Sequence, residues 1–151
     1  ADGKVCLIDE ACPPEELSMD AQKMKRICVF MNVFNVHVNR SPIKGVVKDI
    51  VYKKGQFLNA SLDKASDKNE RSSLVINTDN GTKIIVVQIA GLIARRILGF
   101  ISTNHSLEQG ERFGLIRFGS RVDIYMPLDA VTQCVIGDTV IAGESVLASF
   151  N

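Results

Sequence analysis

Apolar and polar residues alternate along much of this chain, and the alternation predicts strands rather than helices. In residues 114–127, "GLIRFGSRVDIYMP", it runs on both sides of a central Gly119-Ser120 pair. Residues 26–39 end with apolar and polar positions in strict succession, "FNVHVN". Residues 73–89 hold two apolar runs, and between them Asp79-Asn80-Gly81 supply residues that tolerate a positive φ. We therefore expect a hairpin over 73–89 and a mostly antiparallel β fold.

The other segments add strands, loops and little helix. An apolar run at 4–8 predicts a strand, 41–60 has turn residues at each end, 13–25 and 63–72 are polar, and 90–101 predicts a short helix or an irregular strand. Residues 51–62, 102–116 and 134–149 form a weak repeat in which a turn with small residues separates apolar runs. This repeat resembles the hammerhead turns of biotinyl- and lipoyl-type domains. The predicted fold class is an antiparallel β-sandwich with hammerhead repeats and little helix.

Composition limits the function classes. A chain of 151 residues that is 46% hydrophobic predicts one domain over 1–151 with a true core. A net charge of +1 and an aromatic content of 6% without Trp argue against a nucleic-acid partner. The four cysteines lack CxxC spacing and there are only two histidines, so we expect no metal site and reduced, buried thiols.

Few residues are candidates for chemistry. His37 lies between Asn35 and Asn39 on the polar row of a predicted strand, whereas His105 sits in a polar loop where a structural role is expected. Ser120 does not fit the esterase elbow, because strand-like sequence follows it, so Gly119-Ser120 alone indicates a β-bulge. Asp2, before a glycine, alone indicates a turn.

Five phrases occur in the order "ADGKV", "FMNVFNVHVNRSPIKGVV", "DKASDKNERSSLVI", "VVQIAGLIARRI" and "GERFGLIRFGSRVDIYMP". Together they resemble the phosphatidylserine decarboxylase family over essentially the whole chain. The closer resemblance is to its short bacterial and archaeal subfamily, which includes archaetidylserine decarboxylase-like proteins. Such proteins usually carry a further N-terminal part, often apolar, before "ADG". We therefore expect that an upstream segment is missing from this sequence.

The resemblance implies a proenzyme that cuts itself between Gly119 and Ser120, at the "FGSR" phrase of the short form. Residues 1–119 would form a large chain and 120–151 a small one, which stay together as a heterodimer. Ser120 would become a pyruvoyl group, so neither a dissociable cofactor nor a metal is needed. The implied reaction converts phosphatidylserine in membranes to phosphatidylethanolamine through a Schiff base.

The resemblance also implies roles for single residues. Asp2 and Ser120 match two members of the Asp-His-Ser set that drives self-cleavage in long-form relatives, but Arg40 stands where those relatives have its His. Arg40 stays protonated and is not a plausible base, so the base is His37 or another group. His37 is also the expected acid in decarboxylation, because its pKa is near neutral.

Further residues are candidates for substrate binding: Asn35, Asn39 and Arg40 on the polar row, and Arg95 and Arg96 within an apolar segment suited to lipid contact. For Arg95 and Arg96, a core edge with a solvated arginine pair is an equally good interpretation. The expected location is the cytoplasmic face of the membrane, and a homo-oligomer is possible on this basis.

Two alternatives stay open. The substrate could be another aminophospholipid, such as archaetidylserine. The chain could also be a non-catalytic biotinyl-like module, since Asp63-Lys64-Ala65 matches a carrier turn by its letters. That triplet lies in a charged loop instead of a hairpin, which disfavours a carrier.

Overall fold

The structure is a computed structural model that describes residues 1–18, 22–32, 38–56, 60, 68–91, 97–116 and 119–150. Its elements are β1 (Gly3–Ala11), a 3₁₀ helix (Glu15–Leu17), β2 (Met24–Met31), β3 (Val38–Arg40), β4 (Gly45–Lys53), β5 (Arg71–Asn77), β6 (Lys83–Ile89), β7 (Ile97–Gly99), β8 (Ser106–Leu107), β9 (Arg112–Ile116), β10 (Ser120–Met126), β11 (Val131–Thr132), β12 (Thr139–Val140) and β13 (Ala148–Ser149).

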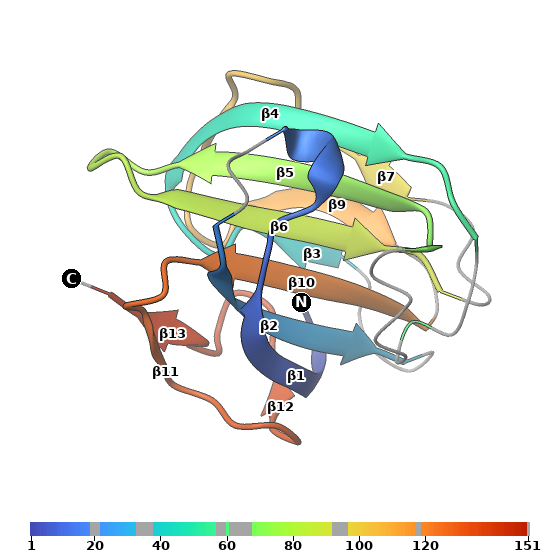
Figure 1. The fold of residues 1–151 in the computed structure, drawn as a ribbon, viewed down its shortest axis with the longest axis vertical. Coiled ribbons are helices and arrows are strands. Elements are labelled where there is room, and N and C mark those ends of the chain that lie inside the picture. Colours follow the sequence, from blue (N-terminus) through green and yellow to red (C-terminus); the bar gives the residue numbers. More distant parts are fainter. Residues whose placement is uncertain are drawn as a thin grey trace.

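One curled sheet dominates the molecule (Figure 1). It has eight strands in the order β12-β1-β2-β10-β6-β5-β4-β8, and its neighbouring strands are antiparallel. A three-stranded sheet, β3-β9-β7, lies behind it, and β11 pairs with β13. The predicted mostly antiparallel β fold with little helix is confirmed.

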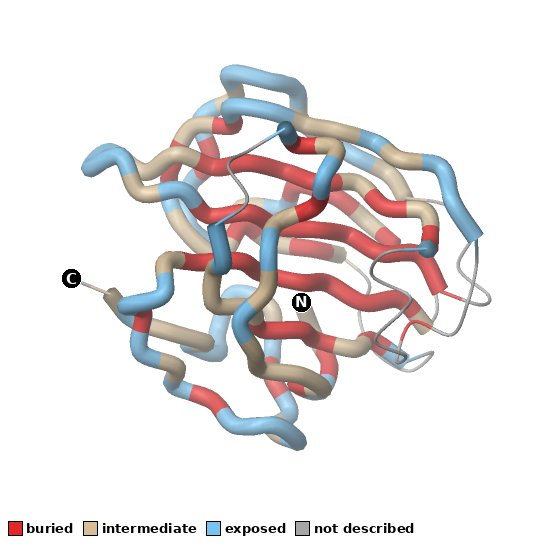
Figure 2. Tube along the Cα trace, in the orientation of Figure 1, coloured by how far each residue is buried: buried red, intermediate tan, exposed pale blue. Residues whose placement is uncertain are grey.

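Apolar clusters cover parts of both faces of the sheet. The inner face carries the larger core, in which Val29, Val86 and Ile124 of the sheet pack with Phe113 and Ile116 of β9. On the outer face a smaller cluster is built from Leu17, Val75, Ile85, Val87, Ile89 and Tyr125. Strands β10 and β6 are buried along most of their length, and the second half of β2 is mostly buried as well (Figure 2).

The local predictions can be compared with these elements. The hairpin over 73–89 is confirmed as β5 and β6, with Gly81 at a φ of 84° in its turn. The 90–101 segment contains β7, while residues 92–96 lie outside the described part. The prediction that the thiols are buried is wrong for Cys12, which is exposed, and for Cys6, which is partly exposed. Cys28 and Cys134 are buried, and none of the four cysteines, all of which the structure describes, forms a disulfide.

Candidate functional site

Gly119-Ser120 lies where the chain enters the central strand of the large sheet. Ser120 is the first residue of β10, is fully buried, and pairs with Met31 of β2. Gly119 has a φ of 66°, in the left-handed region that favours glycine. The break in the strand pattern therefore marks a real backbone turn immediately before the serine.

The hydroxyl of Ser120 is buried without a hydrogen-bond partner among the described residues. Leaving a buried hydroxyl unpaired costs about 1–3 kcal/mol, so such groups are uncommon in folded proteins. Ser73 Oγ shares this property, but Ser73 lies inside the regular strand β5. What distinguishes Ser120 is the combination of an unpaired hydroxyl with a preceding left-handed glycine.

The carbonyl of Gly119 packs directly against a second glycine. A Cβ atom placed on Gly91 would lie 1.8 Å from the Gly119 carbonyl oxygen, so no side chain fits there. Gly91 follows β6, which is hydrogen-bonded to β10. Sequence reasoning missed this contact, because the two glycines are far apart along the chain.

Two buried amide side chains lie on the same face as Ser120. Asn39, on β3, donates from Nδ2 to the sulfur of Met31 at 3.6 Å, and Met31 is the strand partner of Ser120. Gln88, on β6, donates from Nε2 to Asn39 Oδ1 at 2.8 Å. Asn39 was a predicted site residue, whereas Gln88 was not, since a lone polar residue in the run "IIVVQIA" gives little signal.

Asp2 lies at the same end of the sheet as the Gly119–Ser120 bond. Lys4 faces Phe30 and Phe30 faces Arg121, so Gly3 is level with Ser120 and Asp2 with Gly119. Strand β2 lies between them, which separates the two backbones by about 10 Å. The Asp2 carboxylate accepts a hydrogen bond from the backbone N–H of Ala142 in the C-terminal segment. The structure thus brings Asp2 near the bond without direct contact.

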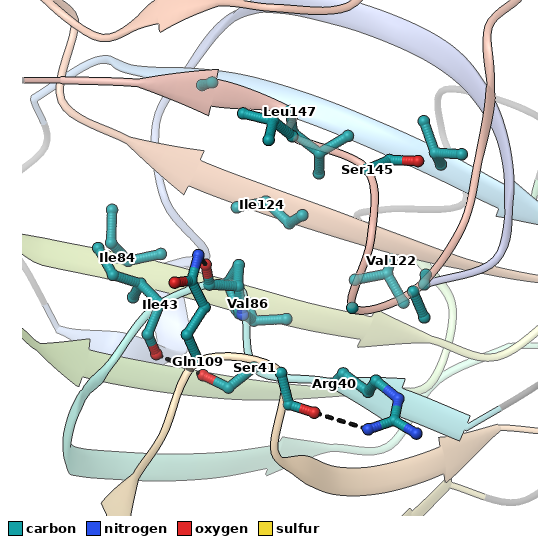
Figure 3. Close-up of a pocket in the computed structure, with 18 of the residues that line it drawn as sticks. Arg40, Ser41, Ile43, Ile84, Val86, Gln109, Val122, Ile124, Ser145 and Leu147 are labelled. Carbon is teal, nitrogen blue, oxygen red and sulfur yellow. Dashed lines mark hydrogen bonds between the residues drawn. The ribbon is translucent and has the colours of Figure 1, made fainter.

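A cavity of about 570 Å³ extends along the inner face of the sheet (Figure 3). Its apolar wall is formed by side chains of the sheet that include Ile84, Val86, Val122 and Ile124. The C-terminal segment, with Leu147 and Ser145, closes the opposite side. Because Val122 is two residues from Ser120 on the same face of β10, the cavity begins close to the serine.

Arg40 supplies positive charge to the lining of this cavity. It lies at the end of β3 and donates from Nη1 to the Gly110 carbonyl oxygen at 2.8 Å, which fixes its guanidinium (Figure 3). The polar part of the lining also includes Ser41, Gln109 and Ser145. Glu144 and the N-terminal residue Ala1 line it as well, so the cavity combines an apolar wall with charged groups of both signs.

On the outer face of β10, next to the serine, the charged side chains Arg121 and Asp123 form an ion pair. Arg121 forms two hydrogen bonds with Asp123, at 2.8 and 3.0 Å, and both side chains are almost completely buried. Burial is the largest influence and would lower the pKa of Arg121, but the charge and hydrogen bonds of Asp123 together with the neighbouring groups outweigh it, and the pKa is raised. Burial also raises the pKa of the neighbouring Cys28, so this thiol stays protonated.

Several predicted residues fall outside the described part of the chain: His37, Asn35, Arg95 and Arg96, and the triplet Asp63-Lys64-Ala65. His105 is described, and its Nε2 lies 2.8 Å from Glu111 Oε2. That hydrogen bond lowers the pKa of Glu111, in keeping with the structural role expected for His105.

The described residues also bear on metal binding and on membrane-spanning helices. Within the described ranges, no group of three or more His, Cys, Asp or Glu side chains could hold a metal ion. None of the helices in this part of the chain is long and apolar enough to span a bilayer.

These observations define a mostly β protein in which a buried serine follows a left-handed glycine beside an apolar cavity. Residues 1–148 match the phosphatidylserine decarboxylase family, and the chain belongs to that family. Membership implies a decarboxylase of phospholipid metabolism with phosphatidylserine as its substrate.

Proposed function

We propose that this chain is the proenzyme of a pyruvoyl-dependent phosphatidylserine decarboxylase, and that it cuts itself between Gly119 and Ser120. The observation that carries the proposal is the buried Ser120 hydroxyl, which has no hydrogen-bond partner among the described residues and directly follows a left-handed glycine. A hydroxyl that makes no hydrogen bond to its surroundings is available to attack the adjacent carbonyl. Family membership supports the same reaction class.

The cleavage requires two successive reactions of the chain itself. First, Ser120 Oγ adds to the Gly119 carbonyl carbon, the C–N bond breaks, and the proton of the hydroxyl passes to the released amine, which leaves an ester. Second, a base removes the Cα proton of Ser120, and Gly119 departs as a carboxylate. The remaining enamine tautomerises to an imine, and water converts it to a ketone and ammonia. Both proton removals need a base within hydrogen-bond reach.

The surroundings of Ser120 fit a small uncharged ketone. The wall on this face is formed by Met31 and by the amide pair Asn39–Gln88, which carry no charge. A pyruvoyl group supplies an electron sink for decarboxylation of an amino acid headgroup, as a dissociable cofactor would. The protein's own contribution is to bind the lipid, orient its carboxylate and move protons.

After cleavage the two chains are expected to remain one folded unit. Ser120 to Met126 form the central strand of the large sheet and pair with β2 on one side and β6 on the other. The small chain, 120–151, therefore keeps its hydrogen bonds and its buried side chains to residues of the large chain. This supports a heterodimer of 1–119 and 120–151.

We assign the proton transfers to residues of the matched phrases. His37 is proposed to protonate the substrate carbon that loses carbon dioxide, because an unperturbed histidine side chain can act as an acid near neutral pH. Asp2 is proposed to assist the base of self-cleavage across β2, since it lies level with Gly119. Arg40 remains a cation and is proposed to hold the lipid phosphate at the cavity.

The cavity is the proposed substrate site. Its apolar wall suits the first part of a lipid chain, and Arg40 suits a phosphodiester. A lipid substrate requires access to a bilayer, so we propose that the enzyme works on the cytoplasmic face of the cell membrane. Arg95 and Arg96 are the proposed contacts to lipid phosphates there.

Intact mass spectrometry under denaturing conditions tests the proposal. We expect fragments 1–119 and 120–151, with the small fragment lighter by one ammonia than a hydrolysis product that starts with serine. An aminooxy reagent should label the small fragment alone. A chain that decarboxylates lipid while it stays uncut would overturn the proposal, and a chain that is uncut and inert would support the binding-module alternative.

The proposed role of His37 has its own test. In cleaved protein, His37→Ala should reduce lipid turnover by about 10²–10⁴-fold, the usual worth of a general acid. His105→Ala is the matched control, because His105 is the other histidine and pairs with Glu111. If the His37 variant never cuts itself, the residue belongs to self-cleavage; if the cut variant turns over at the wild-type rate, its role is structural.

A further inference from the structure

We propose that Gly91 is a positioning residue for the self-cleavage, because its lack of a side chain allows the scissile carbonyl to adopt the orientation that Ser120 needs. This inference rests on the proposed function. Gly91 lies just beyond β6, and Gly119 lies just before β10, so the two glycines meet at one end of adjacent strands.

The contact between them leaves no room for even one carbon atom. A Cβ on Gly91 would lie 1.8 Å from the Gly119 oxygen, 2.8 Å from the Gly119 carbonyl carbon, and 3.3 Å from the Cβ of Ala60. A Cβ on Gly119, in contrast, would meet nothing within 4 Å. The steric constraint on the scissile carbonyl therefore comes from Gly91.

Gly91 cannot easily move away from this contact. The peptide group before it is held through Ala90, whose N–H donates to the Glu70 carbonyl at 3.0 Å. The Ala90 carbonyl accepts a hydrogen bond of 2.7 Å from Nδ2 of Asn69, which is fully buried. A side chain at position 91 would consequently displace the Gly119 carbonyl instead of Gly91.

The orientation of that carbonyl decides whether the hydroxyl can attack. Oγ of Ser120 must approach the face of the Gly119 carbonyl carbon, and the peptide plane sets the angle of approach. Pairing with β2 fixes Ser120 on one side of the bond, and the left-handed φ of 66° fixes Gly119 on the other. The Gly91 contact fixes the oxygen, so displacing it turns the plane. A misplacement of about 1 Å in such a geometry costs about 10²-fold in rate.

The chain offers matched glycine controls. A Cβ on Gly45 would lie 2.5 Å from the carbonyl oxygen of Asn77, so Gly45→Ala causes comparable backbone crowding, but on β4, away from the scissile bond. A Cβ on Gly99 would meet nothing within 4 Å, so Gly99→Ala measures the effect of the methyl group alone.

The experiment follows the cleavage of newly translated full-length chains by denaturing mass spectrometry, at a temperature where circular dichroism shows every variant folded. We expect wild type, Gly99→Ala and folded Gly45→Ala to produce fragments 1–119 and 120–151 at similar rates. Gly91→Ala should be slower by about 10²-fold. Equal rates for Gly91→Ala and wild type, or equal slowing in Gly45→Ala at the same loss of melting temperature, would overturn the inference.

Treatment with hydroxylamine provides a second measurement, whose result does not depend on the stability of the variant. It cleaves an ester and would release a Gly119 hydroxamate together with a small chain that begins with an intact serine. Because Gly91→Ala is proposed to slow formation of the ester, hydroxylamine should release little of the fragments that end at Gly119 or begin at Ser120, which differ in mass from any products of cleavage at Asn80-Gly81. Release would show that the ester forms and that the block lies later, which contradicts the proposal.

If Gly91→Ala proves unfolded, Asn69→Ala replaces it, since loss of the amide frees the Ala90 carbonyl while position 91 stays glycine. Slower cleavage of folded Asn69→Ala is expected, and the wild-type rate would overturn the inference. An uncut wild-type chain would instead overturn the proposed function, so the two failures are distinguishable.

Discussion

Ser120 and Arg121 are neighbours in the same central strand, and both are buried, but their polar groups differ in hydrogen bonding. The Arg121 guanidinium, on the outer face, is held by both oxygens of Asp123. The Ser120 hydroxyl, on the inner face, has no hydrogen-bond partner in the described part of the chain. One strand therefore presents a satisfied ion pair on one face and, on the other, a hydroxyl without a partner in the described part of the chain.

The Arg121–Asp123 pair contributes to the stability of the sheet, whereas no hydrogen bond from the described residues holds the Ser120 hydroxyl. A buried charge without a partner would destabilise the fold by several kcal/mol, so Arg121 has to be paired. A buried hydroxyl without a partner costs about 1–3 kcal/mol, which a fold can tolerate. The outer-face pair anchors the strand that places Ser120 against the Gly119 carbonyl.

Ser120→Ala should give the largest effect on the inner face, namely complete loss of fragments 1–119 and 120–151. Stability should be unchanged or raised by up to about 1 kcal/mol, because an unsatisfied buried group is removed. Denaturing mass spectrometry and chemical denaturation measure the two effects. Ser73→Ala removes the other buried, unpaired serine hydroxyl and should cut like wild type. Cleavage of Ser120→Ala would exclude the serine as nucleophile.

Asp123→Ala should give the largest effect on the outer face, a loss of about 3–5 kcal/mol of unfolding free energy, because Arg121 is left buried and charged. Urea denaturation at neutral pH measures it, in the uncut Ser120→Ala background. The double variant Arg121→Met/Asp123→Leu should recover most of the loss, since both charges are gone. A loss below about 1 kcal/mol in Asp123→Ala would show that the pair does not anchor the strand.

Asp2→Asn should slow self-cleavage by at least about tenfold. The effect should stay below the ~10²–10⁴-fold expected for a group that itself transfers the proton, because β2 separates Asp2 from the bond. A time course of fragment formation provides the measurement. Asp138→Asn makes the same change in the C-terminal segment, where Asp138 accepts from the N–H of Val135, and should cut normally. Equal rates in wild type and Asp2→Asn would remove Asp2 from the mechanism.

Glu16→Gln should give the smallest effect, a loss of about 1–3 kcal/mol at pH 7. Glu16 holds Arg71, a second buried arginine on the outer face, through bonds of 2.5 and 2.6 Å. Burial is the largest influence and would raise the pKa of Glu16, but the hydrogen bonds and charge of Arg71, together with a backbone hydrogen bond and the charge of Lys53, outweigh it, and the pKa is lowered from 4.5. The contribution is therefore complete above pH 4.5 and is lost as the pH falls through the lower folded value.

Denaturation across pH in the uncut background checks this prediction. The stability gap between wild type and Glu16→Gln should be constant near neutrality and should narrow below pH 4.5. A gap that does not change with pH would indicate that lost packing, and not the ion pair, is responsible.

The sequence by itself determined the strands and the candidate bond. Alternation of apolar and polar residues is local, so it revealed the hairpin of β5 and β6 and the strand that contains Ser120. The family resemblance identified Gly119-Ser120, because the phrase around it is short and contiguous, and the family match over residues 1–148 agrees with that resemblance.

Only the tertiary structure decided what surrounds the bond. Asn39, Asp2 and the pair Gln88 and Gly91 reach the Ser120 end of β10 from three segments that are distant in the sequence. Their positions depend on strand order and register, and β10 lies between β2 and β6 although neither is its neighbour along the chain. A periodic pattern states which face a residue occupies, but not which strand lies beside it. The absence of a side chain at Gly91 therefore affects the Gly119 carbonyl only because β6 and β10 are paired.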